Sequence, residues 1–320
     1  MNRMLIMVLL TVCAFGCSED QEQAIVPQEF PEFVDGTLQF QSNERKYTLH
    51  IPDSYDGTED FPLVVFLHGG GGNAASAQGF TNFNQVSDDN DFLVVYPQAF
   101  FASAPNSFVW ADGRGLGPDK LGIDDVGFID ELVSNLKGEY SIDASKVYLC
   151  GFSNGSFLTQ LIAFERNDQF AAIGTLGGTM SVSLFESGNP GRAIPMIYVF
   201  GTDDPLVPYD GGFVSGNPDL EAVVGVEQAV DFWVGNNQVQ STPTTRDIPN
   251  VNTTDNSTVT IFEYEEGDCD SKVVFYKVNG GGHTWPGVAV PNQQTLGQTN
   301  LDVLASQELW DFFDQFELCF

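Results

Sequence analysis

The sequence predicts an α/β domain in which helices flank both faces of a mostly parallel central sheet. Continuous apolar runs bounded by turn residues are typical of strands that are covered on both faces. Helical patterns alternate with these runs, which indicates βαβ units and a parallel sheet. The five runs are residues 62–68, 92–97, 146–152, 170–176 and 194–201. Because no repeat or linker interrupts the sequence, we expect one domain of catalytic size over residues 36–320.

Alternating strands are expected at the start and near the end of the domain. Residues 37–40 and 44–52 alternate apolar and polar side chains, which is typical of half-buried antiparallel strands. Residues 258–264 and 272–278 predict a late strand pair, which we expect on the sheet edge.

Four apolar stripes at helical spacing predict helices. The first is opened by Asp124 and Asp125, whose charges suit the positive end of a helix. Asp125 could instead hydrogen-bond a loop of the functional site. The stripes are Val126, Ile129, Val133 and Leu136; Phe157, Leu158, Leu161 and Ile162; Val223, Val226, Val230 and Trp233; and Leu309, Phe312, Phe313 and Phe316.

The net charge of the chain limits the classes of partner that it can bind. Hydrophobic residues make up 42% of the sequence, which is ample core material, while 44 acidic against 12 basic residues give a net charge of −32. A surface this negative repels phosphate backbones and anionic lipid headgroups, so we expect no nucleic-acid partner. The charge also suits a solvated surface that keeps an exported protein soluble, and it says little about chemistry.

The first residues are typical of a targeting segment. Arg3 precedes an apolar run over residues 5–12, which is too short to span a bilayer, so residues 1–17 predict an export signal. Gly16-Cys17 resembles the cleavage point of a bacterial lipoprotein signal, although Phe15 departs from the usual pattern. We therefore expect an extracellular or outer-surface protein with a lipid anchor on Cys17 as its membrane contact. Residues 18–35 would form an acidic flexible tether.

The pentapeptide G-x-S-x-G marks Ser153 as a candidate nucleophile. Alone it is weak, because a chain with 33 glycines can place a serine between two of them in an ordinary turn. Its position is stronger evidence, since it joins a predicted strand to a predicted helix, as in a nucleophile elbow. Such a turn also directs a helix N-terminus at the reacting atom, which favours developing negative charge.

A serine hydroxyl needs a neighbouring base, and the chain has three histidines, of which His50 and His68 precede Ser153. His283 follows the predicted strand 272–278 and is selected by elimination, although a lone loop histidine is often only a surface residue. The orienting acid should lie between serine and histidine in the sequence. Asp203 and Asp204 both follow the strand 194–201, and spacing does not choose between them.

Two backbone N–H groups should hold the developing oxyanion. One belongs to Asn154, directly after the nucleophile. The other belongs to the glycine-rich segment 68–73, where we assign Gly70 with Gly71 as second choice. Consecutive glycines let a backbone approach a substrate closely, although a plain flexible loop has the same composition.

These residues predict a serine hydrolase that forms an acyl-enzyme, with no cofactor and no metal. Two alternatives to an esterase remain at this point. One is a serine peptidase with the same triad, although amides are harder to cleave and no lid domain is visible in the sequence. The other is a non-catalytic polysaccharide-binding protein on the same scaffold. The sequence specifies no oligomeric state.

Five segments resemble the exported polyhydroxybutyrate depolymerase-like and feruloyl esterase group of the α/β hydrolases: "LHGGGGN", "DDVGFIDELV", "YSIDASKVYLCGFSNG", "FGTDDPLVPYDGG" and "GGHTWPG". The resemblance runs from about residue 37 to the C-terminal helix and implies an α/β-hydrolase fold. It places the acid just before the proline, at Asp204. It implies a serine carboxylesterase whose substrate is an ester-bearing polymer or oligomer with a hydroxyalkanoate, feruloyl or acetyl group. Ser156 stands where the family usually has a second glycine.

The topology that the resemblance implies also bears on the cysteines and on two tryptophans. It would bring Cys319 near Cys269 as a candidate disulfide and leave Cys150 as a buried free thiol. Three buried free thiols are the alternative. Trp110 and Trp285 lie in loops on the expected active-site side. They would either contact substrate or hold their own loops in place.

Overall fold

The structure is a computed structural model that describes residues 29–103, 106–188, 190–289 and 293–319. The strands are β1 (Phe33–Phe40), β2 (Asn43–His50), β3 (Phe61–Leu67), β4 (Leu93–Pro97), β5 (Phe100–Ala102), β6 (Ser107–Val109), β7 (Ile142–Phe152), β8 (Ala172–Leu176), β9 (Met196–Gly201), β10 (Thr244–Asp247), β11 (Thr258–Tyr264) and β12 (Val273–Asn279). The α-helices are α1 (Ala74–Thr81), α2 (Phe83–Asn90), α3 (Gly117–Lys120), α4 (Asp125–Glu139), α5 (Asn154–Glu165), α6 (Val182–Ser187), α7 (Val226–Asn236), α8 (Gln293–Leu296) and α9 (Ala305–Phe313). Single 3-10 turns are η1 (Asn167–Gln169), η2 (Val214–Gly216) and η3 (Asp268–Asp270).

The expected export signal, residues 1–17 with Cys17, lies outside the described residues, as does most of the expected tether. The folded domain begins earlier than residue 36. The Phe30 ring packs edge-on against Tyr55 with 4.8 Å between centroids, and β1 pairs with β2 from Phe33 onward. Within the described residues, no helix is long and apolar enough to cross a membrane.

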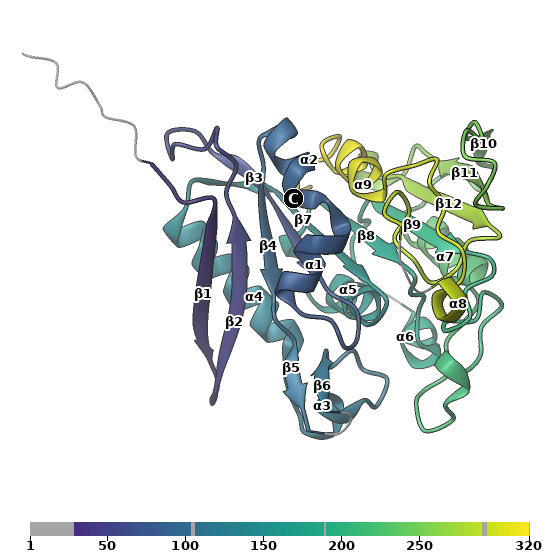
Figure 1. Cartoon of the computed structure of the whole chain (residues 1–320), viewed down its shortest axis with the longest axis horizontal. Helices are drawn as coiled ribbons and strands as arrows, with labels where there is room; N and C mark the ends of the chain where they lie inside the picture. Colours follow the sequence, from purple (N-terminus) through teal and green to yellow (C-terminus); the bar gives the residue numbers. More distant parts are fainter. Residues whose placement is uncertain (1–28, 104–105, 189, 290–292, 320) are drawn as a thin grey trace, which may run out of the picture.

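One ten-stranded sheet forms the centre of the molecule, in the order β1-β2-β4-β3-β7-β8-β9-β12-β11-β10 (Figure 1). The six strands from β4 to β12 in this order run parallel, and antiparallel pairs extend the sheet at both edges. The predicted mostly parallel sheet with an antiparallel start is therefore confirmed. The late strand pair is present, since β11 and β12 pair antiparallel, but it does not form the sheet edge, because β12 joins the parallel block beside β9 and β10 lies beyond β11.

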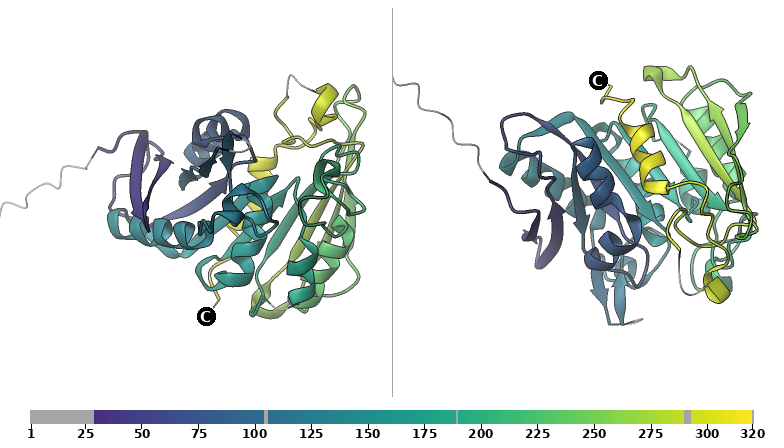
Figure 2. Two further views of the ribbon diagram at one scale, coloured as in Figure 1. Left: turned by 90° about the horizontal axis from the view of Figure 1, so that it is seen from below. Right: turned by 45° about the horizontal axis from the view of Figure 1, so that its top comes forward.

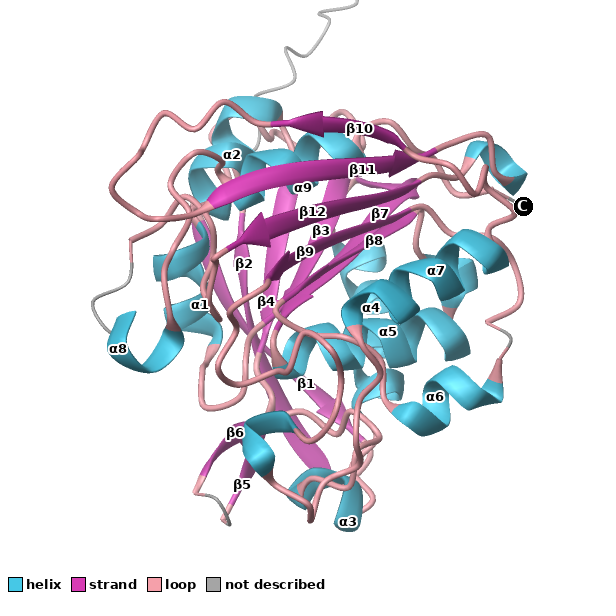
Figure 3. Cartoon of the chain, turned by 90° about the vertical axis from the view of Figure 1, so that its right-hand side faces the viewer, coloured by secondary structure: helices cyan, strands magenta, loops and turns pink. Residues whose placement is uncertain are grey.

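Helices cover both faces of the sheet, as predicted. Helices α4, α5, α6 and α7 lie on one face, and α1, α2 and α9 lie on the other (Figure 3). Helices α2 and α9 lie side by side although they come from distant parts of the sequence (Figure 2).

Each continuous apolar run serves two cores, because successive side chains of a strand point to opposite faces. In β3, Leu63 and Val65 face the core under α4 and α5, while Val64 and Phe66 face the core under α1, α2 and α9. All four side chains are fully buried. This double burial explains why the parallel strands show no alternation in the sequence.

The helices that the stripes predicted are present as α4, α5, α7 and α9. The third stripe is too long at its start, since Val223 precedes α7 and makes isolated bridges to Ser181 and Gly212. Among the described residues, five shorter helices, α1, α2, α3, α6 and α8, escaped prediction. The eight-residue α1 is mostly small and polar, and α2 buries only Phe83, Val86 and Ser87.

Candidate active site

The loops that follow the carboxyl ends of the parallel strands carry every predicted catalytic residue. Ser153 lies between β7 and α5 and is half-buried. Its backbone has φ 54° and ψ −118°, a region that L-residues rarely occupy. Such strain persists only where the surrounding structure imposes it, and it is frequent at functional sites. Ser153 therefore occupies the tight strand–turn–helix that the pentapeptide predicted.

Both glycines of the pentapeptide are required by close backbone contacts. A Cβ on Gly151 would lie 2.4 Å from the carbonyl carbon of Gly155. A Cβ on Gly155 would lie 2.1 Å from the carbonyl oxygen of Leu67, at the end of β3. The helix that follows Ser153 consequently packs directly against the neighbouring strand, which fixes the turn.

Ser156, where the resemblance implied a glycine, fastens this turn to β8. Its Oγ accepts a hydrogen bond from the Leu176 N–H at 2.8 Å and lies 2.6 Å from the Gly151 carbonyl oxygen. The Ser153 N–H also donates to the Leu176 carbonyl oxygen at 2.8 Å. The departure from the family pattern therefore adds a tie behind the elbow.

His283 pairs with Asp204 and not with Asp203. The Nδ1 atom of His283 lies 2.6 Å from Asp204 Oδ2, and both side chains are almost completely buried. The other carboxylate oxygen, Asp204 Oδ1, accepts the backbone N–H groups of Leu206 and Val207 at 2.8 Å each. Because an ionised carboxylate only accepts, Nδ1 carries the hydrogen, and in the neutral imidazole Nε2 then keeps its lone pair. Asp203 is exposed and accepts from the Thr202 hydroxyl.

The His283 imidazole lies next to the elbow. Its ring packs against that of Phe152, the residue before Ser153, with 4.9 Å between centroids. A Cβ on Gly177 would lie 3.2 Å from two ring atoms of His283. A Cβ on Gly178 would lie 3.0 Å from the Ser153 carbonyl oxygen, so this segment packs closely against both residues. The Ser153 hydroxyl makes no hydrogen bond to a described residue, and such contacts often tighten only when substrate is bound.

The glycine-rich loop after β3 lies against the first residue of α5. A Cβ on Gly70 would be 3.6 Å from the Cβ of Asn154. Within the described residues, the N–H groups of Gly70 and Asn154 have no acceptor, whereas the Gly71 N–H donates to the Phe108 carbonyl oxygen at 2.9 Å. This geometry favours Gly70 over Gly71 as the donor that faces a substrate.

The other two histidines have structural partners. The Nδ1 atom of His68 lies 2.8 Å from the Gly69 carbonyl oxygen, and its Nε2 accepts the Ala99 N–H at 3.1 Å. Burial lowers the pKa of His68 to about 4, so its ring is neutral near pH 7. His50 is buried at the end of β2 and contacts Asp88 at 2.8 Å. Elimination of both in favour of His283 agrees with these positions.

Trp110 and Trp285 offer no face on which a substrate ring could stack. They are 0% and 1% exposed, respectively. The indole N–H of Trp285 donates to Ser306 Oγ at 3.2 Å, and its ring packs edge-on against Phe66. The structure therefore favours the alternative, in which each indole holds its own loop in place.

Two buried charged residues near the elbow, Asp112 and Arg114, escaped the sequence argument, whereas the sequence already suggests Asp125 as a loop partner. Asp112 and Arg114 form an ion pair of 2.6 Å in which both side chains are buried. Asp125 accepts the Ala111 N–H at 2.7 Å and pairs with Arg45 at 2.5 Å, so it does hold a loop of the site. Burial raises the pKa of Asp125, and Arg45 opposes that shift. The segment "ADGRG" carries no apolar period that would mark its charges as buried.

Cys269 and Cys319 form a disulfide, the pair that the topology of the resemblance implied, and Cys150 is a buried free thiol. In the described residues, no three His, Cys, Asp or Glu side chains gather where they could hold a metal ion.

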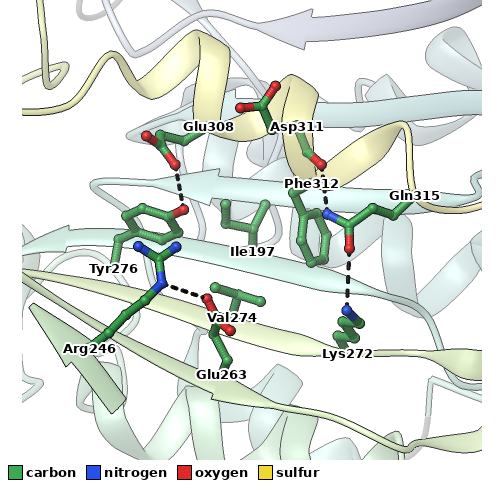
Figure 4. A pocket seen from close by; sticks show the side chains of 10 residues that line it. All are labelled: Ile197, Arg246, Glu263, Lys272, Val274, Tyr276, Glu308, Asp311, Phe312 and Gln315. Atoms are coloured by element: carbon green, nitrogen blue, oxygen red, sulfur yellow. Dashed lines mark hydrogen bonds and ion pairs between the residues drawn. The ribbon is translucent and has the colours of Figure 1, made fainter. Parts of the chain in front are cut away.

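A separate pocket of about 190 Å³ lies between α9 and the β10–β12 side of the sheet (Figure 4). Its charged side chains face one another. Arg246 donates to Glu263 at 3.1 Å, and the Tyr276 hydroxyl donates to Glu308 at 2.6 Å. The pocket opens on the face that α9 covers, away from the loops that carry Ser153. Its mutually satisfied charges give it no evident chemical role.

Comparison with known families decides the relationship of this chain. The family model described as "Esterase PHB depolymerase" matches residues 45–231, more than half of the chain, and includes Ser153 and Asp204. The chain belongs to this esterase family. The chain is a carboxylic ester hydrolase, as the sequence predicted, and the relatives that it matches are named as esterases.

Two curated relatives and one solved structure illustrate this PHB depolymerase-type esterase. Feruloyl esterase C from Emericella nidulans is 30% identical over 212 residues, which cover 66% of this chain and 73% of the relative. The bifunctional acetylxylan esterase/xylanase XynS20E from Neocallimastix patriciarum is 25% identical over 275 residues, which cover 83% of this chain and 33% of that longer protein. The acetyl xylan esterase structure from Aspergillus awamori has a TM-score of 0.56 at 19% identity, covers 79% of this chain and 94% of its own, and supports the α/β-hydrolase fold.

Proposed function

We propose that this esterase cleaves acyl esters of extracellular polymers through a triad of Ser153, His283 and Asp204. The observation that carries the proposal is the buried 2.6 Å contact between His283 Nδ1 and Asp204 beside a strained Ser153. Asp204 holds the imidazole in the tautomer that leaves Nε2 free to accept a proton, and it stabilises the imidazolium that forms.

The proposed reaction has two stages that use the same groups, acylation of Ser153 and hydrolysis of the acyl-enzyme. His283 Nε2 takes the proton of the Ser153 hydroxyl while Oγ attacks the ester carbonyl carbon, which gives a tetrahedral oxyanion. The N–H groups of Gly70 and Asn154 stabilise this negative charge. The C–O bond to the alcohol then breaks, and the imidazolium protonates the departing alkoxide. Water attacks the acyl-enzyme with the same base, releasing the carboxylic acid and restoring Ser153.

We propose feruloyl or acetyl esters of plant polysaccharides, or polyhydroxyalkanoate esters, as the substrate class. The printed names of the relatives support the first two, and the family description supports the third. The N-terminal sequence further supports export and lipid anchoring at Cys17. The acidic composition suits an extracellular setting and disfavours nucleic-acid partners.

A hydrolysis panel of methyl ferulate, acetylated xylan and a short-chain polyhydroxyalkanoate tests both the activity and its substrate. We expect turnover of at least one ester and none of a peptide anilide. In the same panel, Asp204→Asn should lower kcat by about 10⁴-fold because it stabilises the wrong imidazole tautomer.

Asp203→Asn is the matched control for that substitution. It removes the neighbouring charge without touching the imidazole, so kcat should stay within about twofold of the parent. Loss of turnover in Asp203→Asn with activity retained in Asp204→Asn would overturn the assignment of the acid.

A further inference from the structure

The segment of residues 108–114, here called the strap, crosses both loops that carry the proposed oxyanion donors. It begins within β6, and its Trp110 contacts His68 just after β3 and Asn154 just after β7. Most of it is buried: Trp110 is 0% exposed, and Asp112 and Arg114 are each 4% exposed. Charged side chains are almost never buried this deeply unless they are paired, so the strap is a built structure and not a loose loop.

The strap holds the glycine-rich loop at two points. The Phe108 carbonyl oxygen accepts the Gly71 N–H at 2.9 Å, and among the described residues the neighbouring Gly70 N–H has no acceptor. The indole N–H of Trp110 donates to the His68 carbonyl oxygen at 2.8 Å, and the two rings pack with 5.0 Å between centroids. These contacts flank Gly70 on both sides in the sequence.

The strap also occupies the whole side chain of Asn154. The Trp110 N–H donates to Asn154 Oδ1 at 2.8 Å, and Asn154 Nδ2 donates to the Trp110 carbonyl oxygen at 3.3 Å and to Asp112 Oδ2 at 2.6 Å. The carboxamide thus faces the strap through both of its polar atoms. Asn154 consequently faces a substrate only through its backbone N–H.

The Asp112 carboxylate is in turn held by Arg114. Its Oδ2 accepts Arg114 Nε at 3.0 Å and Nη2 at 2.6 Å, and the guanidinium lies 3.5 Å from the centroid of the Phe157 ring in α5. This pair places opposite charges together, so the strap brings no net charge to the oxyanion site. The carboxylate therefore serves as an oriented acceptor for Asn154.

We propose that the strap sets the distance between the two oxyanion donors, with Trp110 and Asp112 as positioning residues. The inference rests on the proposed function. The donors come from separate loops, and transition-state stabilisation requires them to be held within about 0.5 Å. Trp110 is hydrogen-bonded both to the loop that carries Gly70 and to Asn154. Asp112 holds the Asn154 side chain in place, and so restrains the residue whose backbone N–H is the second donor. The strap thereby supports kcat and not the binding of the substrate in its ground state.

Trp110→Phe tests the bridge, because it keeps an aromatic ring and removes the indole N–H. We expect kcat for p-nitrophenyl acetate to fall about 10- to 100-fold, below the cost of deleting a donor outright, with KM within about twofold. The affinity for an alkyl boronic acid, which forms a tetrahedral adduct with the serine, should fall by a similar factor.

Trp233→Phe is the matched control for this substitution. Trp233 is also fully buried, and its indole N–H donates to Gln160 at 3.2 Å in the core under α7. It should lower Tm as Trp110→Phe does while leaving kcat within about twofold, because it touches neither donor loop. Equal kcat values in the two variants would overturn the proposal.

Substitutions of Asp112 supply a second test, which distinguishes loss of a hydrogen-bond acceptor from loss of packing. Asp112→Ala removes the acceptor of Asn154 and should lower kcat about 10-fold or more. Asp112→Asn restores an oxygen that can accept from Nδ2 and should recover part of that loss. If Asp112→Asn is no more active than Asp112→Ala at equal Tm, Asp112 has no positioning role.

The failure of the proposed function has a different signature. In that case the parent enzyme would hydrolyse the ester without acylation of Ser153, whatever the strap variants do. Normal acylation of Ser153 with undiminished kcat in both Trp110→Phe and Asp112→Ala would overturn the strap alone.

Discussion

The two ends of the central sheet are built in different ways. At the carboxyl end, the chain holds Ser153 in a strained conformation, and Asp204, Asp112 and Asn154 are buried in hydrogen-bonded networks. At the amino end, the C-terminal segment is fastened to the sheet. A disulfide joins Cys269 and Cys319, and the Leu318 N–H donates to the Ser145 carbonyl oxygen at 2.8 Å.

This difference separates stability from function. A cross-link acts mainly by restricting the unfolded chain and requires no special geometry at a reacting atom. Buried polar networks contribute little net stability, and they fix directions when every member is satisfied. We therefore expect changes at the amino end to alter unfolding with little effect on turnover, and changes at the carboxyl end to alter turnover or the pH range over which the fold is stable.

The double variant Cys269→Ser/Cys319→Ser is expected to change the free energy of unfolding more than the protonation of His68 described below. The bond closes a loop of 50 residues, so its loss should lower the free energy of unfolding by about 4 kcal/mol. Urea denaturation of parent and variant measures this change. The kcat should stay within about twofold, because β12, with 7 residues and a length of about 23 Å, lies between Cys269 and His283. A large loss of kcat in a folded variant would contradict the separation of the two ends.

His68 makes the carboxyl end sensitive to acid. Its pKa is lowered to about 4 by burial, against an ordinary value of 6.5. Between these values the unfolded chain binds a proton that the folded chain does not, so stability is complete above pH 6.5 and falls as pH decreases toward 4. This one group should remove up to about 3 kcal/mol across that window.

His68→Gln isolates that contribution, because every other titrating group is unchanged. Urea denaturation at pH 7 and pH 4.5 should show a smaller acid-induced loss in the variant than in the parent, even though the variant is less stable at pH 7. Equal losses in the two proteins would show that His68 does not carry the acid sensitivity.

Much of the fold follows from patterns that short windows of sequence contain. The doubly buried strands appear as unbroken apolar runs, and α4 shows its buried stripe at Val126, Ile129 and Val133. By contrast, α1 and α2 lack such a stripe. The pairing of β12 with β9 depends on the order of strands in space, which no local pattern specifies.

Some residues of the candidate site could likewise be predicted from local sequence, and others could not. Ser153, His283 and the two candidate acids could be named because each follows a predicted strand. The choice of Asp204 over Asp203 came from the resemblance, since neighbouring side chains in an extended segment differ only in direction. Asp112 and Arg114 could not be found, because their importance lies in burial against Asn154 and Phe157, which are distant in sequence.

The most direct test of the central claim is covalent labelling with a fluorophosphonate, followed by peptide mass spectrometry. The serine oxygen should displace fluoride at phosphorus, so one labelled peptide containing Ser153 is expected in the parent, and none in Ser153→Ala. Prior incubation with an ester substrate should slow the labelling. A label on another serine, or continued ester hydrolysis by Ser153→Ala at the parent rate, would contradict the account.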